Sequence, residues 1–169
     1  FTEPWLNNSP TTIGFNIFDT KYNYIWNFRQ TGIAINLGRR FKWPDDYFRA
    51  DWGLRIKEND VSEESGSSYY RPGKYTEITI SQTISRTSLN NTFFPTSGSK
   101  FSLSTAWAMG AIGLGETDYL KTQMGVEFNE PLAKINGMDR LVFNLSSTIG
   151  YGSSLKYQDE VSPIELYKM

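Results

Sequence analysis

Residues 48–57 read Phe-Arg-Ala-Asp-Trp-Gly-Leu-Arg-Ile-Lys, so apolar side chains alternate with charged or small ones along the whole stretch. Successive side chains of a β-strand point to opposite faces of a sheet, whereas a helix repeats its apolar positions every three or four residues. The stretch therefore predicts a strand with one apolar face and one charged face.

Six further segments show the same period of two, and no part of the chain has convincing helical periodicity. Their apolar positions run over Ile13–Ile17, Ile33–Leu37, Ile78–Ile84, Phe101–Trp107, Leu120–Phe128 and Leu141–Tyr151. The same columns also hold the uncharged polar residues Thr31, Thr76, Gln82, Thr105, Thr122 and Ser147. The opposite columns contain the charged residues Arg49, Asp51, Arg55, Lys57, Glu77, Lys121 and Glu127. Since 21% of the chain is charged, an apolar face of this size without any charge requires a physical cause.

Two all-β architectures supply such a cause. A strand face turned toward lipid excludes Lys and Arg, which cost about 2–4 kcal/mol each near the middle of a bilayer. A soluble β-sandwich or lipocalin-like barrel would instead turn the apolar face toward its own core. Alternation alone does not separate the two architectures.

The connections between the segments favour a transmembrane barrel, in which tight periplasmic turns alternate with larger outer loops. A sandwich with Greek-key connections has no such obligation. The compact links, which carry prolines, lie at Pro4–Pro10, Gly38–Asp46, Ser88–Ser99 and Glu130–Asp139. Links that are longer, more polar or rich in glycine alternate with them at Asp19–Gln30, Glu58–Lys74, Ala108–Asp118 and after Gly152.

Aromatic residues near the predicted strand ends point the same way, because membrane barrels carry aromatic belts at both interfaces. Aromatic residues are also good strand formers in any sheet, which is the simpler explanation. Beside the compact links lie Trp5, Trp43, Phe93 and Phe94. Near the other strand ends lie Tyr22, Tyr24, Trp26, Tyr69, Tyr70 and Tyr157.

The composition excludes several functions. With no His and no Cys, the 169 residues cannot form a His-based catalytic triad, a thiol nucleophile, a zinc finger or a disulfide. A net charge of −1 gives no general attraction to nucleic acid. The sequence contains no apolar run of about 18 residues that would predict a membrane-spanning helix. It also shows no targeting signal, and we expect it to be an internal segment of a longer protein.

No group of residues predicts a catalytic, cofactor-binding or metal site. The charged set Arg49, Asp51, Arg55, Lys57 and Glu77 fits a solvated wall of neutralising charges, or a lumen wall that holds an inserted loop. The acidic run Glu58, Asp60, Glu63 and Glu64 offers oxygen ligands for calcium but not the spacing of an EF-hand. The run Gly110–Gly115 lacks the context of a phosphate-binding loop. Pro95 and Gly98 are assigned to turn geometry, with φ > 0 at the glycine.

Four short motifs resemble the barrels of the Omp85 superfamily, and specifically its outer-membrane protein assembly factors. Thr2-Glu-Pro-Trp-Leu6 resembles a strand ending of that family, and Ser162-Pro-Ile-Glu-Leu-Tyr167 resembles the approach to its sixth extracellular loop. Phe94-Pro-Thr-Ser-Gly-Ser99, preceded by Ser85–Asn90, resembles a characteristic turn. The run Leu37–Tyr47 is similar to the version found in the Bacteroidota.

The resemblance implies that residues 1–169 are the central part of an outer-membrane β-barrel domain, with strands five to eleven of sixteen. The POTRA modules, the closing strands and the Val-Arg-Gly-Phe motif would then lie outside the chain. Because an open sheet edge in lipid leaves backbone groups unsatisfied, other strands must complete the barrel.

The implied function is folding and insertion of outer-membrane proteins, without covalent chemistry or a cofactor. The implied partners are nascent outer-membrane proteins, accessory lipoproteins and outer-membrane lipid, with no nucleic acid. Two alternatives stay open from the residues. One is a passive pore or secretion barrel of the same superfamily, and the other is a soluble β-barrel that binds a ligand in an apolar pocket.

Overall fold

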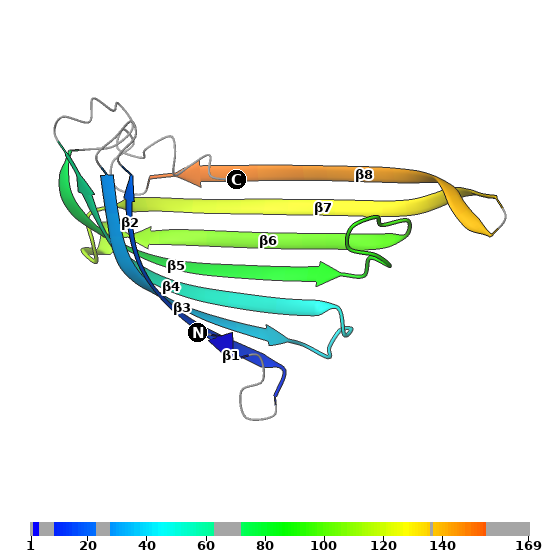
Figure 1. Ribbon diagram of the computed structural model, residues 1–169, viewed down its shortest axis with the longest axis horizontal. Coiled ribbons are helices and arrows are strands. Elements are labelled where there is room, and N and C mark those ends of the chain that lie inside the picture. The colour runs from blue at the N-terminus through cyan, green and yellow to red at the C-terminus, as the bar shows by residue number, and fades with distance from the viewer. Residues whose placement is uncertain (1, 4–8, 23–27, 63–71, 136, 155–169) are drawn as a thin grey trace.

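The computed structural model describes residues 2–3, 9–22, 28–62, 72–135 and 137–154. They form one antiparallel sheet whose strands follow the order of the chain (Figure 1). The strands are β1 (Thr2–Glu3), β2 (Thr11–Tyr22), β3 (Phe28–Arg40), β4 (Phe48–Val61), β5 (Gly73–Thr87), β6 (Gly98–Met109), β7 (Asp118–Ile135) and β8 (Met138–Ser153). The seven predicted strands are therefore confirmed as β2 to β8, and β1 adds a short edge.

The registers align the apolar columns of neighbouring strands. Residues directly opposite each other in an antiparallel pair point to the same face of the sheet. One such row crosses five strands through Ile35, Leu54, Ile80, Trp107 and Leu120. The adjacent row, on the other face, runs through Ala34, Arg55, Thr79, Ala108 and Tyr119. The pairing thus confirms one apolar face and one polar face.

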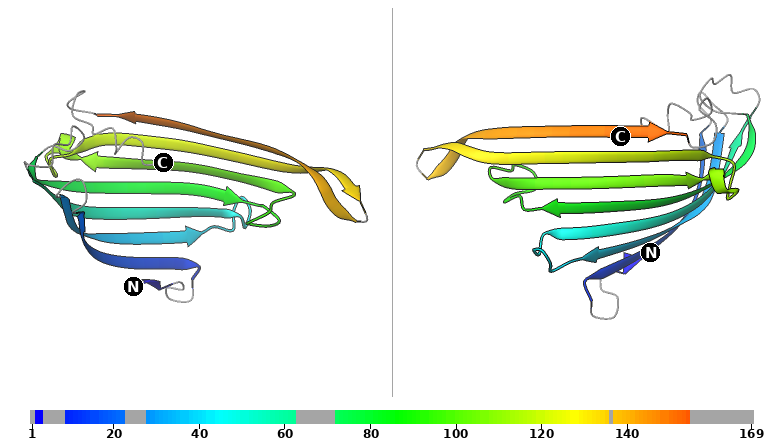
Figure 2. Two further views of the ribbon diagram at one scale, coloured as in Figure 1. Left: turned by 45° about the horizontal axis from the view of Figure 1, so that its top comes forward. Right: turned by 180° about the vertical axis from the view of Figure 1, so that it is seen from behind.

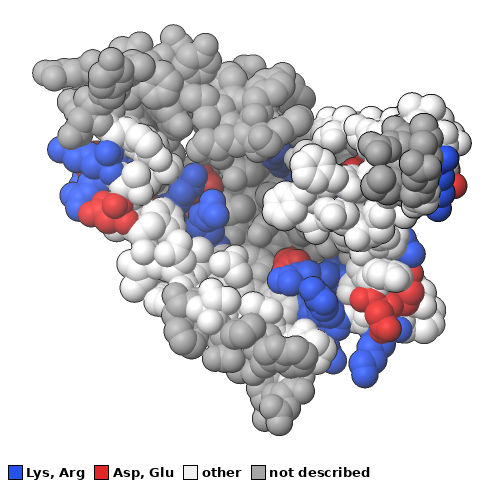
Figure 3. All heavy atoms as spheres, turned by 45° about the vertical axis from the view of Figure 1, so that its right-hand side comes forward, with Lys and Arg blue, Asp and Glu red and all other residues white. Residues whose placement is uncertain are grey.

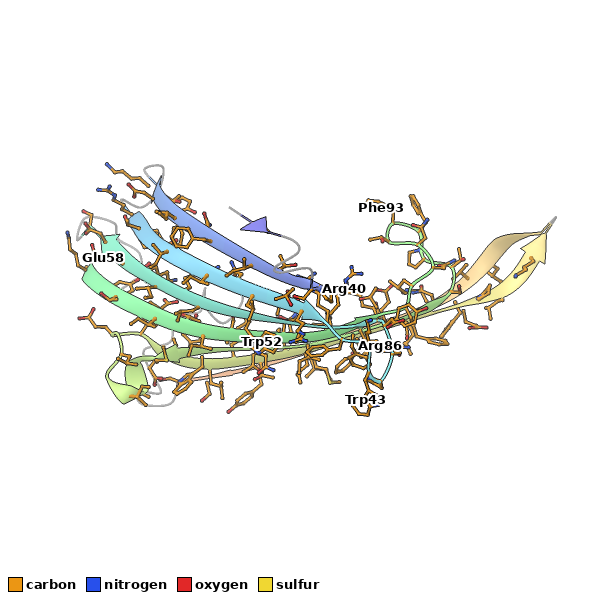
Figure 4. The ribbon with its side chains drawn as sticks, turned by 90° about the horizontal axis from the view of Figure 1, so that it is seen from below. Arg40, Trp43, Trp52, Glu58, Arg86 and Phe93 are labelled. Atoms are coloured by element: carbon orange, nitrogen blue, oxygen red, sulfur yellow. The ribbon has the colours of Figure 1, made fainter. Side chains whose placement is uncertain are left out.

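The sheet is open and curved, so the two faces differ in shape as well as in chemistry (Figure 2). Trp52 of the apolar face lies on the convex side, whereas Arg40 of the polar face lies on the concave side (Figure 4). Large apolar side chains on the convex face are exposed, including Ile17, Leu145 and Ile149. This arrangement is the reverse of a soluble barrel, whose concave face would be the apolar one.

Among the described residues, the concave face carries a small buried apolar cluster at the end of the longer loops. Phe28 and Val61 are opposite each other and buried, and Tyr75 packs against them. Tyr22 stacks on Phe28 with the ring centroids 5.9 Å apart. Tyr22 therefore belongs to this inward cluster, and its assignment to an aromatic belt on the lipid side is wrong.

The strands extend beyond the alternating segments at the loop end. Asp19 and Arg29 were predicted to lie in a link. They belong instead to β2 and β3, where Asp19 pairs with Thr31 and Arg29 pairs with Lys21. Asp60 of β4 pairs with Arg29 from the other side. Asp19, Arg29 and Asp60 all point to the convex face, where charged residues replace the apolar ones. The backbone ladder therefore continues after the apolar alternation has ended, and a pattern based on alternation places the strand ends too early.

The predicted link Glu130–Asp139 is also mostly strand. β7 and β8 continue as a two-stranded ladder as far as the pair of Ile135 and Met138, and Gly137 between them has φ +76°. The register shifts between Pro131 and Lys134, which marks a β-bulge. In Figure 1 this hairpin projects past the ends of the other strands.

The link between β6 and β7 closes part of a strand edge. After β6 the chain makes the short 3-10 helix η3 (Gly110–Ile112), and Gly115 then forms a bridge to Glu77 of β5. The amide of Glu116 donates to the carbonyl oxygen of Thr76 at 2.8 Å. β5 thus gains backbone partners where β6 has already ended. Among the described residues, no helix has the length and apolar character needed to cross a membrane.

Candidate functional site

The charged residues of the concave face form ion pairs along and across the strands. Arg49 and Asp51, two residues apart on β4, form a bidentate pair, with the Arg49 Nε 2.8 Å from both carboxylate oxygens. Both side chains lie over Gly38 of β3, which has no Cβ to block them. The predicted neutralisation of charges on this wall is confirmed for this pair, which is partly exposed.

A second pair, Lys57 and Glu77, is buried rather than solvated. The Lys57 Nζ lies 3.0 Å from Glu77 Oε2, and the two side chains are only 7% and 3% exposed. Thr79 and Tyr119 donate hydrogen bonds to Glu77 Oε1 at 2.9 and 3.3 Å. Because Ala108 lies between Tyr119 and Thr79 in the ladder, the small alanine lets the tyrosine reach across β6. The expectation of a solvated wall is wrong at this position.

The concave face of the described strands carries more cations than carboxylates. Its cations are Arg40, Arg49, Arg55, Lys57, Lys100 and Lys121. Its carboxylates are Asp51, Glu77 and Glu127. In the space-filling view, basic side chains gather in several groups, most of them beside acidic ones (Figure 3). Arg55 is exposed among the small residues of this wall, so the face offers positive potential to solvent.

At the end of the compact links, Arg86 connects two turns. Its Nε donates to Asp45 Oδ2 at 2.8 Å in the turn between β3 and β4. Its Nη1 donates at 3.1 Å to the hydroxyls of Ser88 and Ser99, which flank the turn between β5 and β6. The guanidinium also lies 5.4 Å from the ring centre of Tyr47. The sequence pattern does not reveal this connection, because Arg86 and Asp45 are 41 residues apart.

Two asparagine side chains hold the turn between β5 and β6. Asn90 accepts hydrogen bonds from the amides of Thr96 and Ser97, and Asn91 accepts from the amides of Phe93 and Phe94. Asparagine commonly bonds to nearby amides in this way. The frame leaves Phe93 and Phe94 86% and 82% exposed, with Phe93 on the concave side (Figure 4). Gly98 has φ +105°, as predicted.

The acidic run contributes no metal site within the described part of the chain. Glu58 and Asp60 lie on the convex face, and Asp60 pairs with Lys74 at 3.5 Å. Glu63 and Glu64 fall outside the described residues, and those that are described contain no group of His, Cys, Asp or Glu able to hold a metal ion. The predicted aromatic positions Trp5, Tyr24, Trp26, Tyr69, Tyr70 and Tyr157 also lie outside the described residues.

Comparisons with known proteins agree with this architecture. The family model described as the Omp85 superfamily domain matches residues 1–169. The crystal structure of BamA from Haemophilus ducreyi lacking POTRA domains 1–3 superposes with a TM-score of 0.70 at 17% sequence identity. The match covers 92% of this chain but only 32% of that chain, so the chain spans about a third of its relative. A comparison with curated proteins found no match.

Proposed function

Because the chain belongs to the Omp85 superfamily, we propose that it forms one section of the barrel of an insertase in the bacterial outer membrane. The clients are nascent outer-membrane proteins, and the other partners are accessory lipoproteins of an assembly complex and the surrounding lipid. The catalysis involves no covalent chemistry, cofactor or nucleic acid. It lowers the barrier to folding a strand into the bilayer.

The observation that carries the proposal is a change in height of the apolar belt on the convex face. On β8 the belt runs from Leu145 to Tyr151, six residue steps, which is about 20 Å along the strand, and it ends where Glu130 lies opposite Phe143. On β2 it runs from Ile13 to Ile17, four steps or about 13 Å, and Asp19 follows at once. A strand tilt near 40° reduces these lengths to about 15 and 10 Å of membrane height.

β3 has the same short belt as β2. Its apolar residues run from Ile33 to Leu37, with Arg29 beyond one end and Arg39 beyond the other. Since lysine and arginine avoid the hydrocarbon core, lipid beside β2 and β3 has to thin or the arginines have to reach for the interface. Thinned lipid is easier to cross for a client strand whose backbone is not yet paired.

In this proposal the section acts as a wall rather than as the gate. The belt is taller on the β8 side than on the β2 side, so it creates a gradient of bilayer thickness around the barrel. A client strand would pair with an exposed strand edge elsewhere in the barrel, because edge pairing satisfies backbone groups that lipid cannot. The thin side lowers the cost of bringing that client into the bilayer.

The test is depletion of the parent protein from its own cell, followed by quantification of folded outer-membrane barrels. The proposal expects a loss across unrelated barrels, with unfolded precursors accumulating in the periplasm. If the other barrels stay at normal levels and only permeability or one secreted protein changes, the insertase assignment is wrong.

The belt is tested separately with the double variant Asp19→Leu/Arg29→Leu, which extends the apolar surface of β2 and β3. We expect this variant to insert clients more slowly than the parent into vesicles with 18-carbon acyl chains. With 12-carbon chains the difference should shrink, since that bilayer is already thin. Thr20→Val, a concave-face change on the same strand, is the matched control. Equal rates for all three proteins in both lipids would remove the belt from the mechanism.

The concave wall supports a second candidate within the same family, a passive pore or a secretion barrel. The wall is polar, and Arg55 is exposed on it between Gly53 and Lys57. A lumen of this kind favours anions. Single-channel recordings of the complete protein would favour this candidate if they showed steady, anion-selective conductance that Arg55→Glu reverses.

A further inference from the structure

The hairpin formed by β7 and β8 extends beyond the end of the neighbouring strand β6. β6 begins at Gly98, which is opposite Asn129, but β7 continues to Ile135 and β8 begins only at Met138. Residues 130–135 of β7 therefore have no neighbouring strand on the β6 side among the described residues, and we call them, together with residues 138–143 of β8, the projecting ribbon. In Figure 4 the ribbon bends toward the side on which Arg40 and Phe93 lie, and Figure 1 shows that it twists near its tip.

The other strand ends define where the rim of the barrel lies. Thr11, at the start of β2, shares a row with Leu103 of β6 through three intervening strands. Leu103 lies five residues after Gly98, the first residue of β6. Relative to the rows of paired residues, the end of the sheet therefore shifts by five residues over the four steps from β2 to β6. A tilt of about 40° with strands about 4.8 Å apart produces a drift of about one residue per strand.

The ribbon passes beyond this rim. Continuing the same drift from β6 places the rim near residue 130 on β7 and near residue 142 on β8. β7 continues about five residues past that point and β8 about four, or about 13–17 Å along the strands. The end concerned is that of the compact links, which in membrane barrels is the periplasmic side.

The convex face of the ribbon carries exposed apolar side chains beside one carboxylate, that of Glu130, which lies opposite Phe143. Phe143 and Leu141 extend the column of Leu145 and Ile149 without interruption, and they are 47% and 56% exposed. Leu132, the extra residue of the bulge, is 61% exposed. The apolar surface of the ribbon is therefore continuous with the lipid-facing belt of β8.

Two physical arguments decide what covers this surface. An isolated two-stranded ribbon is marginally stable in water, so its apolar face requires a partner. A strand from another chain is a poor partner, because Pro131 lacks an amide hydrogen and the bulge twists the free edge of β7. Lipid already covers the adjacent belt at Leu145, so the bilayer is the partner nearest to the apolar face of the ribbon.

We propose that the convex face of the projecting ribbon binds the periplasmic leaflet at the boundary between headgroups and acyl chains. Leu141, Phe143 and Leu132 enter this layer, as the apolar residues of interfacial amphipathic segments do. The ribbon anchors the barrel on the side where the belt is tallest. This inference depends on the membrane barrel and not on the insertase activity, so the two can fail separately.

The test uses the complete protein, without other reactive cysteines, in phosphatidylethanolamine–phosphatidylglycerol vesicles. One environment-sensitive fluorophore (NBD) is attached at a time to Leu141→Cys, Leu132→Cys or Val142→Cys. Val142 is adjacent to Leu141 but belongs to the concave column, so it is the matched control. Leu145→Cys reports the belt. Resistance of each labelled barrel to unfolding in a heat-modifiability gel shows that it has folded.

We expect headgroup-level nitroxide lipids to quench the probe at residues 141 and 132 at least twofold more than at residue 142. Aqueous iodide should show the opposite order. Iodide quenching at residues 141 and 142 alike, without lipid quenching, would show that the ribbon stands in water. Shielding of residue 141 from both quenchers would mean that protein covers it. Either result would overturn the proposal.

Discussion

Arg86 on β5 donates a hydrogen bond to Asp45 in the turn between β3 and β4, with Nε and Oδ2 2.8 Å apart. The same guanidinium bonds to Ser88 and Ser99 across the base of the next compact turn. One side chain thus fixes two turns relative to each other, and it places its charge at the end of the lipid-facing belt, where a carboxylate neutralises it.

We expect Arg86→Lys to lower stability by about 1–2 kcal/mol, even though it keeps the charge. A lysine amine cannot reach Asp45 and both serine hydroxyls with the fixed geometry of a guanidinium. The partial exposure of the pair keeps the loss modest. Urea unfolding in vesicles measures it, with Lys100→Arg as the control. A loss no larger than that of the control would show that the two turns are held independently.

The buried pair Lys57–Glu77 gives a second prediction. Lys57→Met should destabilise the barrel by about 3–5 kcal/mol, because it leaves the Glu77 carboxylate buried without its cation. Adding Glu77→Leu should recover much of that loss, since an apolar pair of similar volume needs no compensation. A double-mutant cycle by urea unfolding measures the recovery. If the double variant is as unstable as the sum of the two single ones, the pair is not the source of the effect.

Two glycines with positive φ provide a matched comparison. Gly98 has φ +105°, and a Cβ there would collide with the backbone carbonyl of Ser88. Gly73 has φ +109°, but a Cβ there would meet nothing within 4 Å. Both alanine variants carry backbone strain of about 1–3 kcal/mol, and only Gly98→Ala adds the collision. We therefore expect Gly98→Ala to lower the unfolding midpoint more than Gly73→Ala. Equal midpoints would mean that the backbone at Ser88 can move away from the added Cβ at no measurable cost in stability.

Gln82 is an amide in the middle of the apolar belt. It is exposed on the convex face between Ile80 and Ile84, and no hydrogen bond joins its side chain to the described part of the chain. Since an unpaired amide is costly in hydrocarbon, Gln82→Leu should stabilise the barrel by about 1–3 kcal/mol in vesicles. Thr79→Val on the concave face is the contrast, because it removes a hydrogen bond to Glu77 and should destabilise. A destabilising Gln82→Leu would indicate that the amide has a partner in the complete protein.

Sequence alternation predicted the strands and their two faces because every strand of a barrel wall turns apolar side chains toward lipid and polar ones toward the lumen. This arrangement holds only inside the belt. Beyond it, Asp19 pairs with Thr31 and Arg29 pairs with Lys21 in the ladder, so the true length of β2 and β3 was not visible in the pattern. The projecting ribbon was missed for a related reason, since Pro131 reads as a link although it sits at a bulge.

The side-chain contacts were predictable only in part. Neighbours on one strand, such as Arg49 and Asp51, could be inferred to interact from their spacing. The burial of Glu77 depends on Tyr119, 42 residues away, and on an alanine between them. Contacts of that kind follow from the register between strands, which alternation alone does not specify.

The order of strands in the sheet bears on how this wall is made. From β2 to β7, each described strand pairs with the strand before it and the strand after it in the chain. Each new pairing closes only the short link between two neighbours, so its entropic cost stays small. The wall can therefore be added one hairpin at a time, from either end, and the chain never has to find a distant partner until the barrel closes.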